Sequence, residues 1–368
     1  MENINEIRKR ESIEVGYVNF GYFSPELSST DEYPDYIKAE AQRCIAEIKS
    51  HKTDDSVTFG FMTDIHYSDT PNHNVRTKRL TNAYKEISNA VGADMLILGG
   101  DYVNDGKKAY KLNNYKMLAE HLKGIKYYPV NGNHDDNSIW DLYTENEVSE
   151  NHISAKEIYN CLYAGLADRG AEFNETAFGL YYMYNDNKAK IRYIFLDTSD
   201  IPEKYDEKGK LKYTKQHTFG MQDEQKEWFI NKALRFNESG WRVIITAHSV
   251  KEQHLEFICD TADAFNSRER IEKSYPQEDY KLNVCADFSN ANAEIICFLC
   301  GHEHADFTEY TKGGIPCIYF GNVIMYKTAL PRIDGEKSEL LFDFVTVTED
   351  EIYLTRVGAG EDRTVKIK

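Results

Sequence analysis

Side chains able to bind metal ions stand directly after five short apolar segments of this 368-residue sequence. Aspartate, asparagine and histidine supply the carboxylate, amide and imidazole groups that hold divalent cations in proteins. In an open α/β sheet, ligands bind outside the carboxyl ends of the strands, so side chains in these positions can meet in one crevice. The candidates are Asp64, His66, Asp101, Asn133, His134, His248, His302 and His304.

Two pairs of candidates are separated by a single residue, Asp64 from His66 and His302 from His304. On an extended strand end, residues two apart point to the same side, so each pair can face one site. Imidazole suits zinc, iron, nickel and manganese, and carboxylate adds the oxygen that harder ions prefer. The pattern therefore predicts divalent metal ions at the strand ends.

The stretch CFLCGHEH, residues 297–304, allows a second interpretation because it also holds two cysteines. A structural zinc site of cysteine and histidine needs four ligands, and no second pair stands at a suitable spacing. Cys297 and Cys300 lie inside an apolar run, so we interpret both as buried strand residues. The two histidines that follow remain candidate ligands.

Five motifs, in order, resemble those of the calcineurin-like metallophosphoesterases: DIH (64–66), GDYVNDG (100–106), GNHD (132–135), AHS (247–249) and GHEH (301–304). The resemblance spans about two-thirds of the chain. It implies an α/β fold, a four-layer α/β/β/α sandwich of two mixed sheets flanked by helices. It also implies a dinuclear site for two divalent ions, drawn from manganese, iron, zinc or nickel.

The resemblance further implies a role for each candidate. One ion would be held by Asp64, His66, Asp101 and His304. The other would be held by Asp101, Asn133, His248 and His302, so that Asp101 bridges the two. A hydroxide between the metals would attack a phosphate ester. His134 would protonate the leaving group as general acid, with Asp135 orienting its imidazole.

Three interpretations of the activity stay open. The first is a phosphatase for a small phosphate ester. The second is a phosphodiesterase or nuclease, which would need an open groove. The third is a catalytically silent scaffold that binds metal and a protein partner, although such relatives tend to lose the residue that matches His134. Asp105 stands where related phosphoprotein phosphatases carry a phosphate-binding arginine, which argues against phosphoprotein substrates.

Predicted strands and helices alternate along the chain, as an α/β sandwich requires. Apolar runs predict strands at 57–63, 95–100, 126–130, 191–197, 241–247, 294–300, 315–320, 340–347 and 351–357. Helical spacing predicts helices at 76–92, near 108–123 and at 222–234. The last two strands are joined by the acidic turn TED, which predicts an antiparallel pair.

We expect one metallophosphoesterase domain over residues 56–368, with residues 1–55 as an N-terminal extension packed on it. Within the extension, YIKAEAQRCIAEIKS carries an apolar stripe at helical spacing. Three polar or tyrosine-rich stretches follow strand ends, near 136–190, 198–221 and 250–293. We expect them to be insertions that wall or cover the site.

The composition argues against several classes of protein. A net charge of −17 argues against non-specific nucleic-acid binding, which needs a basic surface. A bound metal can still reverse the local sign of charge for an anionic substrate. Seven cysteines in so long a chain are not a disulfide framework. No apolar run suits a signal peptide or a membrane span. We therefore expect a cytoplasmic protein that acts on a small phosphate ester, with no membrane contact and no particular protein partner indicated.

Overall fold

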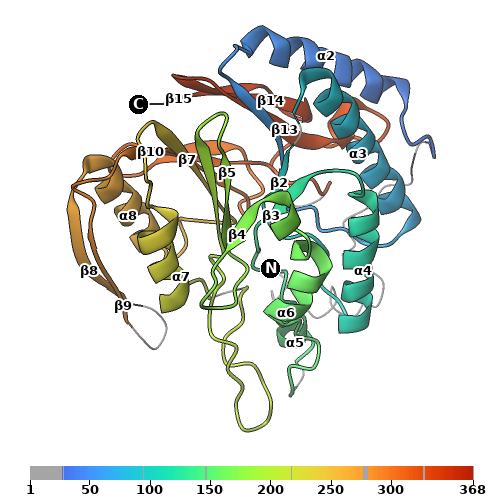
Figure 1. The fold of residues 1–368 in the computed structure, drawn as a ribbon. Coiled ribbons are helices and arrows are strands. Elements are labelled where there is room, and N and C mark those ends of the chain that lie inside the picture. The colour runs from blue at the N-terminus through green and yellow to red at the C-terminus, as the bar shows by residue number, and fades with distance from the viewer. Residues whose placement is uncertain are drawn as a thin grey trace.

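The computed structural model describes residue 27 and residues 29–93, 95–145, 147–216, 218–276, 281–325 and 328–367. Within these ranges the chain forms two large β-sheets that pack face to face, and helices cover the outer face of each sheet (Figure 1). This architecture is the α/β/β/α sandwich of two mixed sheets that the motifs implied.

The first sheet has six strands in the order β15-β14-β13-β1-β2-β3. Its strands are β1 (Val57–Met62), β2 (Leu96–Leu98), β3 (Tyr127–Pro129), β13 (Leu341–Val347), β14 (Glu351–Gly358) and β15 (Arg363–Lys366). β1, β2 and β3 run parallel, so their carboxyl ends meet at one edge of the sheet. β13 and β14 form the antiparallel pair predicted from the closing segments.

The second sheet has seven strands in the order β11-β12-β10-β7-β6-β5-β4. Its strands are β4 (Ala171–Phe173), β5 (Tyr182–Asp186), β6 (Ile191–Leu196), β7 (Trp241–Ala247), β10 (Ala293–Cys300), β11 (Phe307–Tyr310) and β12 (Pro316–Tyr319). The four central strands, β6, β7, β10 and β12, are parallel. All nine predicted strands are therefore present, and Cys297 and Cys300 are buried in β10 as predicted.

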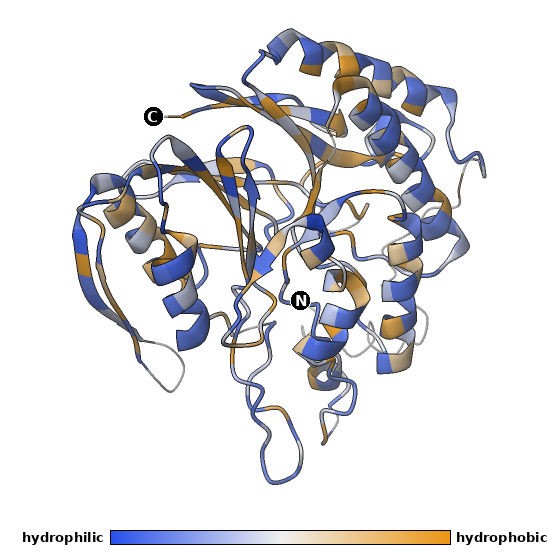
Figure 2. Cartoon of the chain, in the orientation of Figure 1, coloured by the Kyte–Doolittle hydropathy of each residue, from blue (hydrophilic) through white to orange (hydrophobic). Residues whose placement is uncertain are grey.

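Alternate residues of the second sheet face two different apolar layers. Along β6, Tyr193 and Phe195 pack toward the first sheet, whereas Ile194 and Leu196 pack toward the outer helices. This period of two follows from the pleat of a strand. Because both faces of the sheet are covered, its central strands are nearly continuous apolar runs. Figure 2 shows apolar residues in the strands and more hydrophilic residues on the outer surfaces of the helices.

Helices of different lengths form the outer layers. The first sheet is flanked by α2 (Asp35–His51), α3 (Pro71–Val91) and α4 (Lys108–His121), and the second by α7 (Asp223–Trp228) and α8 (Glu256–Ser267) (Figure 1). α3 ends at Gly92, whose left-handed conformation provides the predicted C-terminal stop. α7 continues as a π-helical turn, so the helix predicted at 222–234 is present in two parts.

α2 confirms the helix predicted within the N-terminal extension. Its apolar stripe is buried, namely Ile37, Ala41, Cys44, Ile45 and Ile48. The helix packs against α3 and β14. It therefore belongs to the layer that covers the first sheet, while the boundary near residue 55 stays a prediction.

Two of the three expected insertions contain helices and strands of their own, and residues 198–221 form isolated β-bridges. Residues 136–190 form α5 (Ser138–Tyr143) and α6 (Ala155–Ile158) and then supply β4 and β5 to the second sheet. Residues 250–293 supply α8 and the two-stranded ribbon of β8 (Arg270–Pro276) and β9 (Lys281–Asp287). Of the helices that the structure describes, none has the length and apolar character needed to cross a lipid bilayer.

Candidate metal centre

The seven predicted ligands come together at the carboxyl ends of strands from both sheets. The first sheet supplies Asp64, His66, Asp101 and Asn133 after β1, β2 and β3, and the second supplies His248, His302 and His304 after β7 and β10. Hydrogen bonds and short ion-pair distances join them into one cluster. Side chains up to 240 positions apart in the sequence are thus in contact.

Asp101 lies in the middle of this cluster. Its Oδ2 is 3.7 Å from Nε2 of His66 and 3.3 Å from Nε2 of His248. Its Oδ1 accepts a hydrogen bond from the backbone N–H of His134 at 2.9 Å. A carboxylate between two groups of imidazoles can contact two cations, which is the bridging position implied by the motifs.

One group of ligands surrounds Asp64. Nε2 of His304 lies 3.1 Å from Oδ1 of Asp64. With His66 these residues offer three donor atoms within 4.8 Å of one another, and Asp64, Asp101 and His248 form a second such trio. Two overlapping trios of donors are suited to two neighbouring divalent ions.

The second group is centred on the amide of Asn133. Its Oδ1 is 3.0 Å from Nε2 of His248 and 3.1 Å from Nδ1 of His302. Nδ1 of His248 lies 2.7 Å from the carbonyl oxygen of Gly99, which directs Nε2 toward the cluster. The structure thus brings together both predicted sets, and their role as metal ligands stays a prediction.

Five of the seven candidates have a backbone conformation that residues other than glycine rarely adopt. The torsion angle φ is positive at Asp64 (53°), His66 (43°), Asp101 (54°), His302 (70°) and His304 (53°). Each such conformation costs on the order of 1–3 kcal/mol and persists where the surrounding structure imposes it, most often at functional sites. The strain falls on the residues that also carry the donor atoms.

Two glycines allow the loops to approach the ligands closely. Gly100 has a φ of 102°, and a Cβ there would lie 2.5 Å from Nδ1 of His248. At Gly132 a Cβ would lie 2.2 Å from Oδ1 of Asp101. Any larger residue would displace a candidate ligand, so glycine is required where β2 and β3 lead into the site.

The buried carboxylates of the cluster favour positive charge next to them, and His248 would have to release its proton to bind a metal ion. Although burial raises the pKa of Asp64, the imidazoles of His304 and His248 hold it below its usual value. Burial opposes a charge on His248, yet Asp101 raises the pKa of His248 to about 10. Burial lowers the pKa of His66 to about 3, so His66 is a neutral imidazole. Buried carboxylates beside imidazoles form a donor set that suits divalent metal ions.

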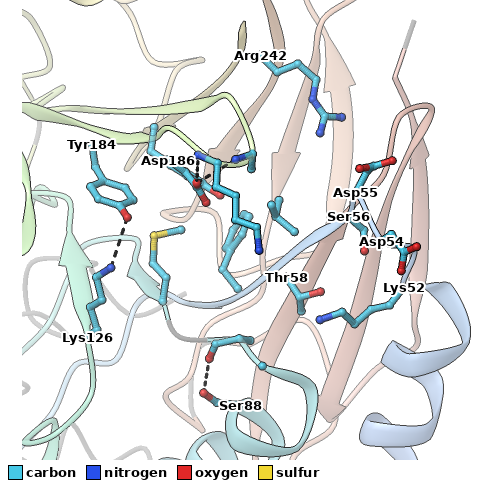
Figure 3. A pocket seen from close by; sticks show the side chains of 18 of the residues that line it. Lys52, Asp54, Asp55, Ser56, Thr58, Ser88, Lys126, Tyr184, Asp186 and Arg242 are labelled. Atoms are coloured by element: carbon cyan, nitrogen blue, oxygen red, sulfur yellow. Dashed lines mark hydrogen bonds between the residues drawn. The ribbon is translucent and has the colours of Figure 1, made fainter. Parts of the chain in front are cut away.

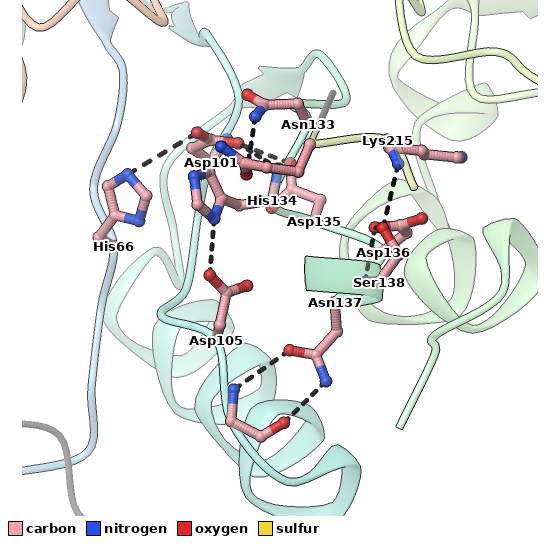
Figure 4. Close-up of polar contacts among 12 residues, drawn as sticks. His66, Asp101, Asp105, Asn133, His134, Asp135, Asp136, Asn137, Ser138 and Lys215 are labelled. Atoms are coloured by element: carbon pink, nitrogen blue, oxygen red, sulfur yellow. Dashed lines mark hydrogen bonds and ion pairs between the residues drawn. The ribbon is translucent and has the colours of Figure 1, made fainter. Parts of the chain in front are cut away.

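His134 stands beside the cluster and pairs with Asp105 rather than with a metal ligand (Figure 4). Its Nδ1 is 2.6 Å from Oδ2 of Asp105. Nζ of Lys111 donates to Oδ1 of Asp105 at 2.9 Å and to the carbonyl oxygen of His134 at 2.6 Å. Burial disfavours a charged imidazole, but Asp105 and Asp101 raise the pKa of His134 above its usual value.

The expectation that Asp135 orients His134 is wrong. The carboxylate of Asp135 accepts hydrogen bonds from the backbone N–H groups of Asp101, Tyr102 and Gly132 at 3.1, 3.0 and 2.7 Å. It therefore fixes the two loops that carry Asp101 and Asn133. Asp105 occupies the place expected for Asp135, and its position four residues after Asp101 in the same loop was the signal for this contact in the sequence.

One side of the cluster reaches solvent. The side chains of Asp64, Asp101 and His248 are at most 2% exposed. Those of His134 and His302 are 21% exposed, and that of His304 is 18% exposed. A substrate can therefore reach the site along the edge formed by these three histidines.

Figure 3 shows a cavity of about 700 Å³ whose lining residues do not belong to this cluster. It is lined by residues at the opposite ends of the strands, such as Val57 at the start of β1 and Arg242 near the start of β7. Lys126 and Asp186 bring charges of both signs to its wall. None of the candidate ligands lines this cavity, so it is separate from the candidate metal site.

The sandwich fold and the site together define the class of this protein. Two mixed sheets present two carboxylates, one asparagine and four histidines at their strand ends, with a histidine–aspartate pair at the exposed edge. This is the arrangement of a metal-dependent hydrolase with a dinuclear centre.

The sequence profile of the calcineurin-like phosphoesterase family matches residues 57–306, which is well over half of the chain. The chain therefore belongs to the calcineurin-like phosphoesterases and is a phosphoric ester hydrolase. No curated protein matches the sequence significantly.

Solved structures resemble this chain at low sequence identity. A dimetal phosphatase from Danio rerio is 15% identical with a TM-score of 0.54, over 85% of this chain and 99% of that chain. A conserved uncharacterised protein of Streptococcus pneumoniae, a predicted phosphoesterase, is 10% identical with a TM-score of 0.31, over 84% of this chain and 98% of that chain. An NAD nucleotidase from Haemophilus influenzae is 12% identical with a TM-score of 0.35, over 84% and 50%. Only the first supports the fold.

Proposed function

We propose that this protein hydrolyses a small phosphate ester at the strand-end cluster and that His134 protonates the leaving group. The observation that carries the proposal is the position of the His134–Asp105 pair beside the seven candidate ligands. A scaffold that only binds metal would have no use for an acid at this place. The mechanism needs no covalent bond between enzyme and phosphate.

Asp64, His66, Asp101 and His304 would hold one divalent ion, and Asp101, Asn133, His248 and His302 the other. Two such ions, when bound, supply positive charge for the oxygens of the phosphoryl group and lower the pKa of water to about 7. Manganese, iron, zinc and nickel all suit this set of oxygen and nitrogen donors. Asp135 holds the loops of Asp101 and Asn133 together, because its carboxylate accepts hydrogen bonds from the backbone N–H groups of Asp101 and Gly132.

His134 performs the second part of the reaction. Asp105 lies on Nδ1 of the ring and stabilises the imidazolium form, whose Nε2–H is the proton to be donated. Lys111 in turn holds Asp105 through its other oxygen. The leaving alkoxide would receive its proton at the exposed edge of the site, where His134 reaches solvent.

The test is a panel of alkyl and aryl phosphate monoesters and diesters, assayed with Mn²⁺. The wild type is expected to turn over members of the panel, and the ratio of monoester to diester rates decides between phosphatase and phosphodiesterase. His134→Ala is expected to keep its metal and to lose about 10²- to 10⁴-fold in kcat on the alkyl esters, whose leaving group needs a proton. A metal-loaded wild type that turns over no ester would contradict the proposal and favour the silent scaffold.

We further propose that the protein acts in the cytoplasm. All seven cysteines are free thiols, and Cys285 is exposed. An exposed thiol persists in a reducing compartment and is oxidised outside it. Cell fractionation that recovers the protein with the membrane or secreted fraction would contradict this location.

A further inference from the structure

Gln216 contacts the Asn133 half of the metal centre, although no sequence motif includes it. Its Oε1 accepts a hydrogen bond from Nδ2 of Asn133 at 3.0 Å. An amide whose nitrogen is held in this way presents its oxygen to the opposite side. That oxygen lies 3.0 Å from Nε2 of His248 and 3.1 Å from Nδ1 of His302. Gln216 therefore selects the orientation in which Asn133 offers oxygen to a cation.

The loop that carries Gln216 is anchored close to its contact. The backbone N–H of Lys215 donates to Oγ of Ser138 at 3.1 Å, and this hydroxyl donates to Asp136 at 2.8 Å (Figure 4). Ser138 is the first residue of α5, which follows the loop after β3. The segment 198–221 is thus tied to the chain segment that also positions the amide ligand.

Glu252 contacts the same half of the site from another segment. Its Oε1 lies 3.4 Å from Nε2 of His302, while Nδ1 of this ring faces Asn133. The edge of the ring also packs on Phe219, with 5.3 Å between the centroids. A histidine that binds a metal through one nitrogen usually donates its other N–H to a carboxylate or carbonyl, which fixes the ring and strengthens it as a ligand.

We propose that Gln216 and Glu252 are positioning residues for one of the two metal ions, the one expected at Asn133, His248 and His302. The inference rests on the proposed function, since it requires that metal centre. Both contacts fall on the same half of the cluster, and each comes from a segment expected as an insertion. Residues 198–221 and 250–293 would therefore set the affinity of one metal position without supplying a ligand.

The experiment is a calorimetric titration of metal-free protein with Mn²⁺ alone, in the absence of any ester. Wild-type protein is expected to bind two ions. Gln216→Leu and Glu252→Ala are each expected to weaken one binding constant by about 10- to 100-fold, which is the usual effect of removing the partner of a ligand. The other binding constant should not change.

Conservative variants distinguish positioning from a general structural role. Gln216→Glu keeps the oxygen that accepts from Asn133 and is expected to keep wild-type affinity. Glu252→Gln keeps the size of the side chain but removes its charge, so its affinity should lie between those of the wild type and Glu252→Ala. Gln253 and Glu256 are exposed neighbours, and Gln253→Leu and Glu256→Gln should bind Mn²⁺ like the wild type.

A double variant assigns the effect to His302. In a His302→Ala background, Glu252→Ala is expected to cause no further loss of affinity. Unchanged constants in the single variants, equal weakening of both sites, or a further loss in the double variant would overturn the inference. If Gln216→Leu does not fold, the Glu252 series decides the outcome.

The failure of this inference differs from the failure of the proposed function. A wild type that binds two Mn²⁺ ions and hydrolyses esters, with variants that bind equally well, overturns only the role of Gln216 and Glu252. A wild type that binds no pair of ions overturns the metal centre and the inference together.

Discussion

Replacing Asp105 should separate protonation of the leaving group from metal binding. Asp105→Asn is nearly isosteric but removes the carboxylate whose Oδ2 lies 2.6 Å from Nδ1 of His134. Lys111 keeps its second contact, the carbonyl oxygen of His134 at 2.6 Å, so the buried cation retains an acceptor. No candidate ligand is altered, and the variant should still bind two metal ions.

The size of the effect follows from the bond that is lost. A hydrogen bond to a charged group contributes about 1.5–3 kcal/mol, and about 1.4 kcal/mol corresponds to a tenfold change in rate. We therefore expect kcat to fall by roughly 10- to 150-fold on an alkyl phosphate, whose leaving alkoxide needs a proton. On 4-nitrophenyl phosphate kcat should change little, because nitrophenolate leaves without protonation.

The assay compares kcat on these two esters with Mn²⁺ for the wild type, Asp105→Asn and Asp135→Asn. Asp135 is the matched control, because it holds the backbone N–H groups of Asp101 and Tyr102 and does not contact the imidazole. Its loss should lower turnover of both esters together. An equal loss on both esters for Asp105→Asn, or no loss on either, would refute the role of the His134–Asp105 pair.

Three further predictions concern stability and metal dependence. Arg356→Leu leaves buried Asp343 without its cross-strand partner. The free energy of unfolding, measured in urea, should fall by about 3–5 kcal/mol. Arg270 is exposed, so the control variant Arg270→Leu should have almost no effect. Burial raises the pKa of Asp197 from 3.8 to about 6, so the folded state favours the protonated carboxyl. The free energy of unfolding of the wild type, relative to that of Asp197→Asn, should therefore fall as the pH rises from about 4 to 6 and then stay level. A difference in stability that is independent of pH would contradict this. EDTA should abolish hydrolysis and lower Tm, and added Mn²⁺ should restore both; full activity in EDTA would exclude a metal-dependent reaction.

The sheets could be predicted because their central strands are buried on both faces. Such strands are continuous apolar runs, and β6, β7 and β10 were each located from that signal. The ribbon of β8 and β9 was not predicted, because neither strand is a continuous apolar run: β9 buries only every second residue, and β8 buries only Ile271 and Tyr275. β4 has three residues, too few for a periodic pattern.

The ligand cluster was predictable because parallel strands bring their carboxyl ends to one edge. The residues that orient the cluster were not. Asp105 and Asp135 are both buried carboxylates near His134, and the path of the loop between β2 and α4 decides which one reaches the ring. Gln216 and Glu252 reach the site from segments without any motif, so their contacts depend on tertiary structure alone.

The central claim is that two metal ions lie between the ligands of the two sheets. Anomalous diffraction from crystals of the Mn²⁺-loaded protein tests it directly. We predict two anomalous peaks, one in contact with Asp64, His66 and His304 and the other with Asn133, His248 and His302, with Asp101 touching both. A single peak, or two peaks away from Asp101, would contradict the dinuclear centre and the mechanism built on it.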